Sequence, residues 1–420
     1  MLVDPTSLFE RRRFAIKPGL ERVKALLERL GSPERNLTAV HIVGTNGKGS
    51  TAAMLASITS RAGYRTGLFT SPHLIHFRER FRINGSEIDQ ERLERLTAQV
   101  VALADEESTF FEITTAMALR YFADEATDVV ILEAGMGGEH DATAVAQGPL
   151  TLVTPIDFDH CQWLGKDLAT ITETKLRIAR SGSIVLSTPQ QPDVARVIQE
   201  QCQKHHIRYR SVATDLQQGA LVYRGSDGDP VQVTVPLAGR HQLTNAALAV
   251  AAAQMLSSCG IPIRDSAIVD GIAAVQWPGR LQFQSYQGAN LILDGAHNPA
   301  GIATLVAWLQ EQTFPQPPLL LCGVMDDKDM TELPTRLAPL VSEVCTVTIN
   351  QERAMSAAVL ARQFTEAGCH TIAAPSLQEG LKQLLGDNGQ GKTIIITGSL
   401  YLVGEALALT QGVDCHAVRG

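Results

Sequence analysis

The chain has 420 residues, a formal net charge of −8 and an apolar content of 45%. Its length exceeds the size at which one hydrophobic core usually stops growing, so two domains are expected. The negative charge argues against a nucleic-acid partner or an anionic membrane surface, because both require a concentrated basic face. The only basic triplet, residues 11–13, is interpreted as a solvated turn.

The seven cysteines are scattered, odd in number and never spaced as Cys-x-x-Cys. This pattern favours free thiols in a reducing compartment over a disulfide framework or a zinc site. The N-terminal residues lack a basic segment followed by a long apolar run. No apolar stretch approaches the ~20 residues needed to cross a bilayer. We therefore expect a cytoplasmic protein.

The strongest local signal begins with an apolar run at residues 38–43, which leads into Gly44-Thr-Asn-Gly-Lys-Gly-Ser-Thr51. An alanine-rich helix is expected to follow over residues 52–62. A strand, a loop of small residues and a helix N-terminus together form an anion cradle, in which backbone N–H groups and the helix dipole point at a phosphate. Lys48 adds a full positive charge. The segment therefore predicts a phosphate site.

The spacing within this segment differs from the common P-loop, which has four residues between its first glycine and the Gly-Lys pair. Here two residues separate Gly44 from Gly47, and Gly49 precedes the hydroxyl residues. Ser50 or Thr51 can still offer a hydroxyl to a magnesium ion. The alternative is a strand-to-helix turn without a ligand, and the required order of residue types disfavours it.

Other apolar runs are expected to be strands, and three of them end beside polar residues. Nearly continuous apolar runs are typical of buried parallel strands, and polar groups at strand ends mark the ligand crevice of an open α/β sheet. The three pairs are residues 66–70 with Ser71, 128–132 with Glu133, and 150–154 with Asp159 and His160. A cation beside a triphosphate needs such ligands, although a lone carboxylate can equally cap a helix or form an ion pair.

The remaining elements of the first half follow from periodicity and turn residues. Helices are predicted at 19–30, 89–104 with Asp89 as its cap, 113–123 and 245–256, a further strand at 183–187, and a hairpin at 220–224 and 231–235. Lys175 falls on another expected helix. The residues alone leave open whether it is an ordinary solvated lysine or a functional one.

A domain boundary is predicted at Trp277-Pro-Gly-Arg280, because Pro-Gly breaks the preceding helix and a new β/α series starts soon afterwards. Apolar runs at 290–293, 319–322, 344–349, 371–374 and 393–397 indicate a small doubly wound domain. The fold class is α/β. We expect a mostly parallel, P-loop-type sheet with helices on both faces in residues 1–285, and a smaller Rossmann-like domain in residues 286–420.

In this second domain, Asp294, His297 and Asn298 follow an apolar run and precede a helix expected to start at Pro299. Asp294 could accept hydrogen bonds from a ribose or an ammonium group, and His297 could hold a carboxylate or a phosphate. The alternative is local structure alone, with Asn298 capping the helix. Residues 325–329 and 398–401 close two further strands at the same edge.

Taken together, these motifs resemble the folylpolyglutamate synthase and dihydrofolate synthase family, within the Mur-type ATP-dependent amide ligases. The likeness covers nearly the whole chain, and the order and spacing of its motifs are more specific than any one of them. The motifs are residues 14–20, 44–51, 70–73, 79–85, 133–138, 141–143, 159–165, 241–247, 278–280, 294–299, 323–329 and 398–405.

The resemblance implies an enzyme of folate biosynthesis and one-carbon metabolism. It would use ATP to activate a pteroate or folate carboxylate as an acyl phosphate and then join L-glutamate to it, as dihydrofolate synthase, folylpolyglutamate synthase or both. It further implies two Mg²⁺ ions and a monomer. This chemistry agrees with the residues, because an amide can form from a carboxylate in water only after a better leaving group has been installed, and Lys48 and magnesium would neutralise charge on the phosphoryl group.

The resemblance also implies residue roles. ATP would be bound by Gly44, Thr45, Asn46, Gly47, Lys48, Gly49, Ser50, Thr51, Asn245, Arg280 and Asp294. Magnesium would be bound by Ser71, Glu133 and His160. The pteroate site would comprise Thr109, Phe110, Phe111, Glu112, His140, Asp141 and Ala142, and glutamate would meet His297 and Ser399. Lys175 matches a lysine that is carbamylated in this family, and together with Lys48, Glu133 and His160 it forms the expected catalytic set.

Two segments depart from the family pattern. Where the family has Gly-Gly-Arg-Leu-Asp-Ala-Thr-Asn, this chain has Glu139, His140 and Ala144 in place of arginine, leucine and asparagine. The family's Glu-Lys-Ala-Gly-Ile is Thr-Lys-Leu-Arg-Ile at residues 174–178. These departures leave open a Mur-type ligase that uses another carboxylate or another amino acid. A nucleotide-binding protein without catalysis is a third hypothesis, and the retained catalytic set argues against it.

Overall fold

The computed structural model describes Leu8, residues 19–217 and residues 219–415. The basic triplet at 11–13 and most of the segment 14–20 lie outside these residues. Two compact units divide the chain. The first comprises Met1–Ser71, Arg78–Pro236 and His241–Gln276, and the second comprises Pro72–Phe77, Leu237–Arg240 and Trp277–Gly420. The two short pieces of the second unit that interrupt the first had no counterpart in the sequence analysis.

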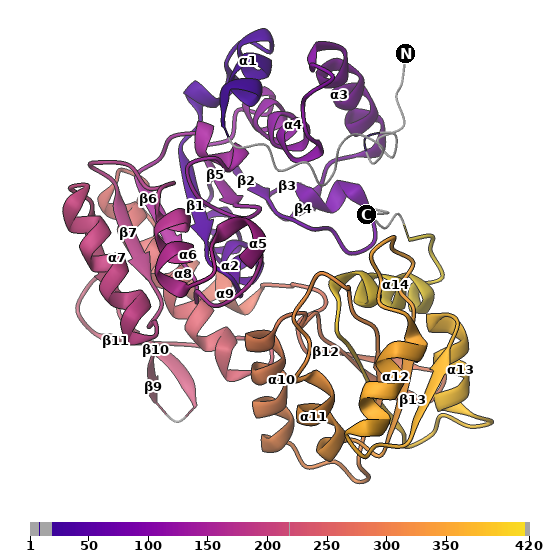
Figure 1. The fold of residues 1–420 in the computed structure, drawn as a ribbon. Coiled ribbons are helices and arrows are strands. Elements are labelled where there is room, and N and C mark those ends of the chain that lie inside the picture. The colour runs from indigo at the N-terminus through magenta and orange to yellow at the C-terminus, as the bar shows by residue number, and fades with distance from the viewer. Residues whose placement is uncertain (1–7, 9–18, 218, 416–420) are drawn as a thin grey trace. The chain divides into compact units, whose positions relative to one another are not determined.

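The first unit is built on an eight-stranded sheet with the order β4-β3-β2-β5-β1-β6-β7-β8 (Figure 1). Its strands are β1 Ala39–Val43, β2 Thr66–Phe69, β3 Phe81–Ile83, β4 Ser86–Glu87, β5 Val129–Glu133, β6 Leu150–Val153, β7 Ile184–Ser187 and β8 Arg208–Ser211. All pairings from β2 to β8 are parallel, and β3 and β4 form an antiparallel edge. Every residue of β1, β2, β5, β6 and β7 is buried, as expected for parallel strands covered on both faces.

The helices of this unit largely follow the sequence prediction. They are α1 Glu21–Arg29, α2 Lys48–Arg61, α3 Gln90–Leu103, α4 Phe110–Asp124, α5 Cys161–Leu164, α6 Leu168–Leu176, α7 Pro192–Lys204, α8 Arg240–Ser258 and α9 Asp265–Ala273. Asp89 caps α3 by accepting a hydrogen bond from Arg92 N, as predicted. Helices α1, α3 and α4 pack against one another, α2 packs on β2, β5 and α9, and α6 packs on α7.

Three helix starts were predicted too late. Helix α2 begins at Lys48 instead of residue 52, because Gly47 adopts a left-handed conformation directly before it. Helix α4 begins at Phe110 instead of residue 113, because Thr109 and Glu112 form a capping box. Helix α8 begins at Arg240 instead of residue 245. The first two corrections place the candidate ATP and acceptor residues in first helical turns.

A small antiparallel sheet completes the first unit, with the order β11-β10-β9. The predicted hairpin is confirmed as β10 Ala220–Arg224 and β11 Pro230–Val233. Strand β9, Asp215–Gln217, was not predicted. All three of its residues are exposed, so it carries no alternating apolar pattern.

The second unit contains a six-stranded sheet with the order β12-β13-β17-β14-β15-β16. Its elements are β12 Gln282–Tyr286, β13 Ala289–Leu293, α10 Pro299–Glu311, β14 Leu319–Cys322, α11 Leu333–Leu337, β15 Glu343–Val347, α12 Ala357–Glu366, β16 Thr371–Ala374, α13 Leu377–Leu385, β17 Thr393–Thr397 and α14 Leu400–Gln411. All five predicted strands are present and parallel to one another. The antiparallel edge strand β12 was missed because it is half polar.

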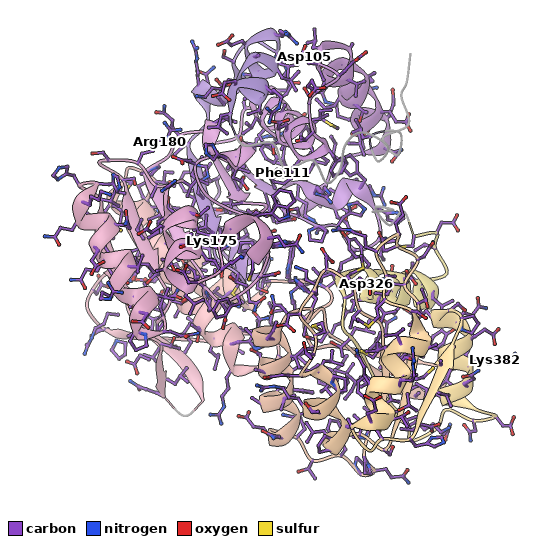
Figure 2. The ribbon with its side chains drawn as sticks, viewed as in Figure 1. Asp105, Phe111, Lys175, Arg180, Asp326 and Lys382 are labelled. Atoms are coloured by element: carbon purple, nitrogen blue, oxygen red, sulfur yellow. The ribbon has the colours of Figure 1, made fainter. Side chains whose placement is uncertain are left out.

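Alternate residues of the second sheet enter two separate cores. Leu291 and Leu293 of β13 belong to one cluster, together with residues of α13 and α14. Ile292 belongs to the other cluster, together with residues of α10 and α12. Since successive side chains of a strand point to opposite faces, helices cover both faces of this sheet. The doubly wound architecture predicted for the second half is confirmed. Figure 2 shows the side chains of the two units and labels Phe111, Lys175 and Arg180 in the first unit.

In the first sheet, the winding changes direction around β1. The chain passes from β1 to β2 on one side, and from β5 across β1 to β6 on the other. Because these strands are parallel, the loops after β1, β2, β5 and β6 all lie at one edge. Such a switch point is where open α/β sheets bind ligands. The predicted glycine loop and strand-end residues therefore share this edge.

Candidate active site

The loop between β1 and α2 requires glycine at both of its ends. Gly44 has a φ of 142°, and a Cβ atom there would lie 2.0 Å from Thr154 Oγ1. Gly47 has a φ of 86°, and a Cβ atom there would lie 2.5 Å from Asn245 Oδ1. A positive φ combined with so close a neighbour is tolerated only by glycine. The bare backbone of this loop can therefore approach a phosphate closely.

Hydrogen bonds to the segment after β6 hold this loop in shape. Thr45 N donates to Pro155 O at 2.8 Å. Thr45 Oγ1 donates to Asp157 O at 2.9 Å and accepts from Asp157 N at 3.0 Å. The two neighbouring strand ends are thus linked through one threonine side chain, which preorganises the loop before any ligand binds.

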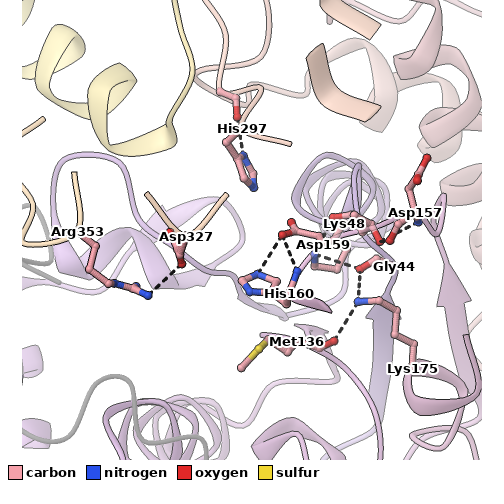
Figure 3. A network of polar contacts seen from close by, with 12 residues as sticks. Gly44, Lys48, Met136, Asp157, Asp159, His160, Lys175, His297, Asp327 and Arg353 are labelled. Atoms are coloured by element: carbon pink, nitrogen blue, oxygen red, sulfur yellow. Dashed lines mark hydrogen bonds and ion pairs between the residues drawn. The ribbon is translucent and has the colours of Figure 1, made fainter. Parts of the chain in front are cut away.

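The first turn of α2 combines a cation with buried hydroxyl groups. Lys48 Nζ donates to Gly44 O at 3.3 Å and to Thr45 O at 3.0 Å, so the side chain folds back over the loop (Figure 3). Ser50 and Thr51 are buried. Among the described residues, neither Ser50 Oγ nor Thr51 Oγ1 has a hydrogen-bond partner. A buried hydroxyl left without a partner costs about 1–3 kcal/mol, and a phosphate or a cation at this turn would supply the missing partner.

The predicted metal ligands Ser71 and Glu133 lie together. Glu133 ends β5, is 5% exposed, and its Oε2 accepts a hydrogen bond from Ser71 N at 3.0 Å. His160 follows β6 with a φ of 52°, and its N–H donates to Asp159 Oδ1 at 2.8 Å. In the described part of the chain, no group of three or more His, Cys, Asp or Glu side chains is placed to hold a metal.

Lys175 is not a solvated lysine. Its residue is 3% exposed, and its Nζ donates to Gly44 O at 2.9 Å and to Met136 O at 3.0 Å (Figure 3). Helix α6 therefore delivers an amine to the point where the loops after β1 and β5 meet. Lysine is almost never fully buried without such partners, so the two carbonyl groups explain how the amine can lie at the sheet edge.

Asn245 of α8 reaches the same loop from another direction. It is buried, its Nδ2 donates to Gln242 Oε1 at 3.0 Å, and its side chain lies against Gly47. The structure thus brings the candidate ATP residues of the first unit around one loop. These residues come from two segments that are about 200 residues apart in the sequence.

The candidate acceptor residues on α4 form a tightly held helix start. Thr109 Oγ1 accepts from Glu112 N at 3.2 Å, and Glu112 Oε2 accepts from Thr109 N at 2.7 Å. The Phe111 ring lies 6.0 Å from the Phe69 ring, between centroids, and packs against Gly135. Gly135 is two residues beyond Glu133, so the acceptor residues border the edge that carries the predicted metal ligands.

Asp141 organises the glycine-rich turn after β5. Its Oδ2 accepts from Met136 N and Gly137 N, each at 3.1 Å, and its Oδ1 accepts from Thr143 N at 3.0 Å and Thr143 Oγ1 at 2.6 Å. These four contacts explain why an aspartate is needed here whether or not it touches a substrate. His140 beside it is exposed, and Ala142 is buried.

The two departures from the family pattern meet in space. Arg177 Nη1 lies 2.9 Å from Glu139 Oε1, and His140 Nε2 lies 3.5 Å from the same oxygen. The acid that replaces the family's arginine is therefore balanced by an arginine that stands where the family has glycine. The three side chains are about half exposed, so the pair lies at the rim of the turn.

In the second unit, Asp294 holds the chain around the end of β13. Its Oδ2 accepts from Leu281 N and its Oδ1 from Ala296 N, each at 3.0 Å. Burial raises the pKa of this carboxyl group above its usual value, and the nearby Arg280 guanidinium opposes that shift. Arg280 also donates from Nη1 to Gly279 O at 3.0 Å.

The other candidates of this unit also sit at strand ends. Asn298 caps α10 by accepting from Gly301 N at 2.9 Å, which confirms the predicted cap. His297 Nδ1 lies 2.8 Å from Gly295 O. Ser399 follows β17 and caps α14 by accepting from Tyr401 N at 3.1 Å. Because β13 and β17 are parallel neighbours, these residues share one edge of the second sheet.

Two arginines near the site were not predicted. Arg22 of α1 pairs with Glu112, which lies 90 residues further along the chain, and Arg177 pairs with Glu139 at a separation of 38 residues. No local pattern signals such pairs. The Thr109–Glu112 capping box, by contrast, follows the Thr-x-x-Glu pattern and could have been found from the sequence.

Comparison with known proteins agrees with this arrangement. The Mur ligase middle domain matches residues 42–253, and the Mur ligase glutamate ligase domain matches residues 279–400. Both halves of the chain therefore match domains of Mur-type ligases. The chain is 33% identical to the dihydrofolate synthase/folylpolyglutamate synthase of Bacillus subtilis, over 94% of this chain and 95% of that protein.

Solved structures narrow the class further. The structure of Escherichia coli FolC in complex with DHPP and ADP superposes with a TM-score of 0.87 at 28% identity, covering 97% of each chain. Mycobacterium tuberculosis folylpolyglutamate synthase complexed with ADP has a TM-score of 0.86 at 30% identity, covering 98% of this chain and 100% of that one. The chain belongs to the folylpolyglutamate synthase/dihydrofolate synthase family.

None of the helices in the described part of the chain is both long enough and apolar enough to cross a bilayer.

Proposed function

We propose that the chain is an ATP-dependent ligase that joins L-glutamate to the carboxyl group of a pteroate or folate through an acyl phosphate. The observation that carries this proposal is the loop after β1. The amines of Lys48 and Lys175 donate hydrogen bonds to carbonyl oxygens of this loop. Beside it, the buried hydroxyls of Ser50 and Thr51 have no hydrogen-bond partner among the described residues. Such a cradle suits the transfer of a γ-phosphoryl group.

The reaction has two steps. In the first, an oxygen of the acceptor carboxylate attacks the γ-phosphorus of ATP, the bond to the β-phosphate oxygen breaks, and ADP leaves. In the second, the glutamate amine attacks the acyl carbon, phosphate leaves and the nitrogen loses a proton. Lys48 would offset the charge of the transferring group, and the backbone N–H groups of residues 44–51 would hold the phosphates.

We further propose that Ser71, Glu133 and His160 hold magnesium. The Ser71–Glu133 contact places a hydroxyl residue beside a buried carboxylate at the correct edge of the sheet. When bound, Mg²⁺ would neutralise phosphate charge and orient the phosphates. The protein's part is to keep Glu133 in place through the Ser71 N–H and to present the adjoining loop.

Carbamylation of Lys175 is a separate proposal. Its support is the place of the amine, which is buried and held by Gly44 O and Met136 O where the loops after β1 and β5 meet. In that step the amine nitrogen bonds to the carbon of carbon dioxide and loses a proton. A mass increase equal to one carbon dioxide on the peptide containing Lys175, absent from Lys175→Arg protein, is the expected result. An unmodified peptide under bicarbonate would contradict it.

A different acceptor is the second candidate function, because Glu139 and Ala144 depart from the family pattern. The ion pair with Arg177 favours the pteroate or folate acceptor, since it restores a cation beside position 139 and leaves no uncompensated acid. The assignment of the first unit to ATP and acceptor and of the second unit to glutamate belongs to the same proposal. The monomeric state and the cytoplasmic location remain predictions from the sequence.

The test is release of ADP and phosphate across a panel of acceptors, each with and without L-glutamate. Dihydropteroate probes the first glutamate addition, a reduced folate that already carries one glutamate probes chain extension, and non-pterin carboxylates probe the alternative. We expect ADP release that requires both glutamate and a pterin acceptor, and that is lost in Lys48→Ala protein. ADP release only with a non-pterin carboxylate would overturn the acceptor class.

A further inference from the structure

A partly buried ion pair connects helix α1 to the first turn of α4. Arg22 Nη2 lies 2.8 Å from Glu112 Oε1, and Arg22 Nε donates to Glu112 Oε2 at 3.3 Å. We propose that Arg22 is a positioning residue for the carboxylate acceptor: through Glu112 it sets the orientation of the helical turn that receives the acceptor. This inference rests on the proposed function for the identity of the ligand.

The geometry of the pair is that of a strong interaction. The guanidinium fork engages both carboxylate oxygens, which fixes the relative orientation of the two groups as well as their distance. The side chains are 21% exposed for Arg22 and 7% exposed for Glu112. Removing one partner of such a pair leaves a buried charge uncompensated, which is far more disruptive than breaking an exposed pair.

Glu112 has a second task, because the same carboxylate closes the capping box of α4. Its Oε2 accepts from Thr109 N at 2.7 Å while Thr109 Oγ1 accepts from Glu112 N at 3.2 Å. One side chain therefore decides both where α4 begins and how its first turn is held against α1. Loss of the Arg22 side chain would therefore alter the position of Glu112 and, through the capping box, that of Thr109.

This turn carries the aromatic side chains of the candidate acceptor site. A Cβ atom on Gly135 would lie 2.8 Å from the Phe111 ring, so the ring rests directly on the turn that follows β5. The guanidinium of Arg80, itself 4% exposed, lies 5.3 Å from the centroid of the Phe110 ring. The start of α4 is thus aligned with the edge that carries Glu133. A misplacement of about 1 Å in such an arrangement can reduce a rate by about 100-fold.

Helix α1 also provides a matched control. Arg29 is seven residues from Arg22 and likewise pairs with an acid, with Nη1 2.8 Å from Asp105 Oδ1. Its pair is about half exposed and holds the segment between α3 and α4, since Arg29 Nη1 also donates to Leu103 O at 2.8 Å. Figure 2 shows Asp105 apart from Phe111. Loss of Arg29 removes an ion pair from the same helix without touching the capping box.

The experiment compares Arg22→Ala, Arg22→Lys, Glu112→Gln and Arg29→Ala in the full chain. We expect Arg22→Ala to raise the KM for the pterin acceptor by about 10-fold or more and to change the KM for ATP by less than about 2-fold. Arg22→Lys keeps one charge and should recover part of the loss. Arg29→Ala should stay within about 2-fold of wild type for both substrates.

Amide hydrogen exchange in residues 109–115 gives a readout that does not need turnover. Exchange should become faster in Arg22→Ala and Glu112→Gln protein and remain at the wild-type rate in Arg29→Ala protein. Equal changes in the KM values for acceptor and ATP, or unchanged exchange in Arg22→Ala, would overturn the inference. If the wild-type protein shows no turnover with any pterin acceptor, the proposed function is wrong. The hydrogen-exchange comparison would still decide whether Arg22 orders the first turn of α4.

Discussion

The two sheets present similar polar edges that differ in how their hydrogen bonds are satisfied. At the edge of the first sheet, Ser50 Oγ and Thr51 Oγ1 are buried without partners among the described residues. At the edge of the second sheet, Asp294, Asn298 and Ser399 all accept from backbone N–H groups of their own chain. Thr397 Oγ1 is a buried exception there.

This difference indicates two ways in which an α/β edge can serve a ligand. At the first edge, the Ser50 and Thr51 hydroxyls lack partners among the described residues, so a ligand there can complete their hydrogen bonding, whereas Lys48 and Lys175 would have to exchange a carbonyl partner for a phosphate. The second edge uses its side chains to shape the loops, and a ligand there must add to existing bonds or replace them. The same residue types therefore have different consequences when they are mutated.

The largest expected effect is at the first edge. Lys48→Ala should lower kcat by about 100- to 1000-fold, because the cation beside the transferring phosphoryl group is lost. Steady-state ADP release measures this loss. The thermal unfolding midpoint should stay close to that of wild type, because Lys48 donates only to two carbonyl groups of a loop that Thr45 also holds in place. Retention of full turnover would contradict a role for the loop in catalysis.

The two units should respond to acid in opposite directions. Burial lowers the pKa of His41 in β1 from 6.5 to about 4, so its contribution to stability is complete above pH 6.5 and is lost as the pH falls toward 4. A shift of this size corresponds to about 3 kcal/mol. The pKa of Asp294 is raised, so its protonated form favours the folded second unit, and that contribution is lost as the pH rises through the raised pKa.

Hydrogen exchange with peptides from each unit, measured between pH 7 and pH 4, checks this contrast. Peptides of β1 and its neighbours should lose protection on acidification before peptides of β13 do. His41→Gln should flatten the response of the first unit, since the glutamine amide has no charge to gain in this range. An unchanged response in the His41→Gln protein would remove His41 as the cause.

A third comparison separates ligand binding from folding. Ser50→Ala removes a hydroxyl that has no protein partner among the described residues, so stability should stay the same or rise by up to about 1–3 kcal/mol while the KM for ATP rises by about 10-fold. Asp294→Ala leaves the buried N–H groups of Leu281 and Ala296 without their acceptor and should lower the free energy of unfolding by about 1–3 kcal/mol. Urea unfolding and ATP titration of both variants test this. An equal loss of stability in the two variants would contradict the proposed difference between the two sheet edges.

The smallest effect is expected at the rim of the turn after β5. The exposed Glu139–Arg177 pair should contribute less than about 1 kcal/mol to stability. Glu139→Arg alone places two cations together and should raise the KM for the acceptor by about 2- to 5-fold. The double variant Glu139→Arg/Arg177→Gly, which restores the family pattern, should return to the wild-type value. If the double variant stays as impaired as the single one, the two departures are independent.

Much of the fold could be predicted because its signals are local. The buried strands β1, β5 and β6 are continuous apolar runs, and the caps Asp89 and Asn298 stand directly before their helices. Strands β3, β4, β8, β9 and β12 were not predicted. They lack that signal, since they are short or their residues are exposed or alternate with polar ones. The late start assigned to α4 was an avoidable error, because its capping box is visible in the sequence.

The candidate site was less predictable where it depends on distant contacts. Sequence reasoning could not decide whether Lys175 was solvated or functional, since its partner Gly44 O lies 131 residues away. It interpreted Glu139 only as a departure from the family pattern that leaves another acceptor open, because nothing local relates this residue to Arg177. The assignment of Pro72–Phe77 to the second unit is also a product of packing, since Ile75 belongs to a core cluster of that unit.

The sequence by itself determined the glycine loop, the buried parallel strands, about two thirds of the helices of the first unit, and the family. These depend on backbone conformations, hydrogen bonds and periodicities that operate within a few residues. Only the tertiary structure decided which polar groups are left for a ligand and which hold the chain together. Whether Lys175, Arg22 or Ser50 finds a partner depends on segments that meet after folding, because burial and hydrogen-bond satisfaction are properties of the packed molecule.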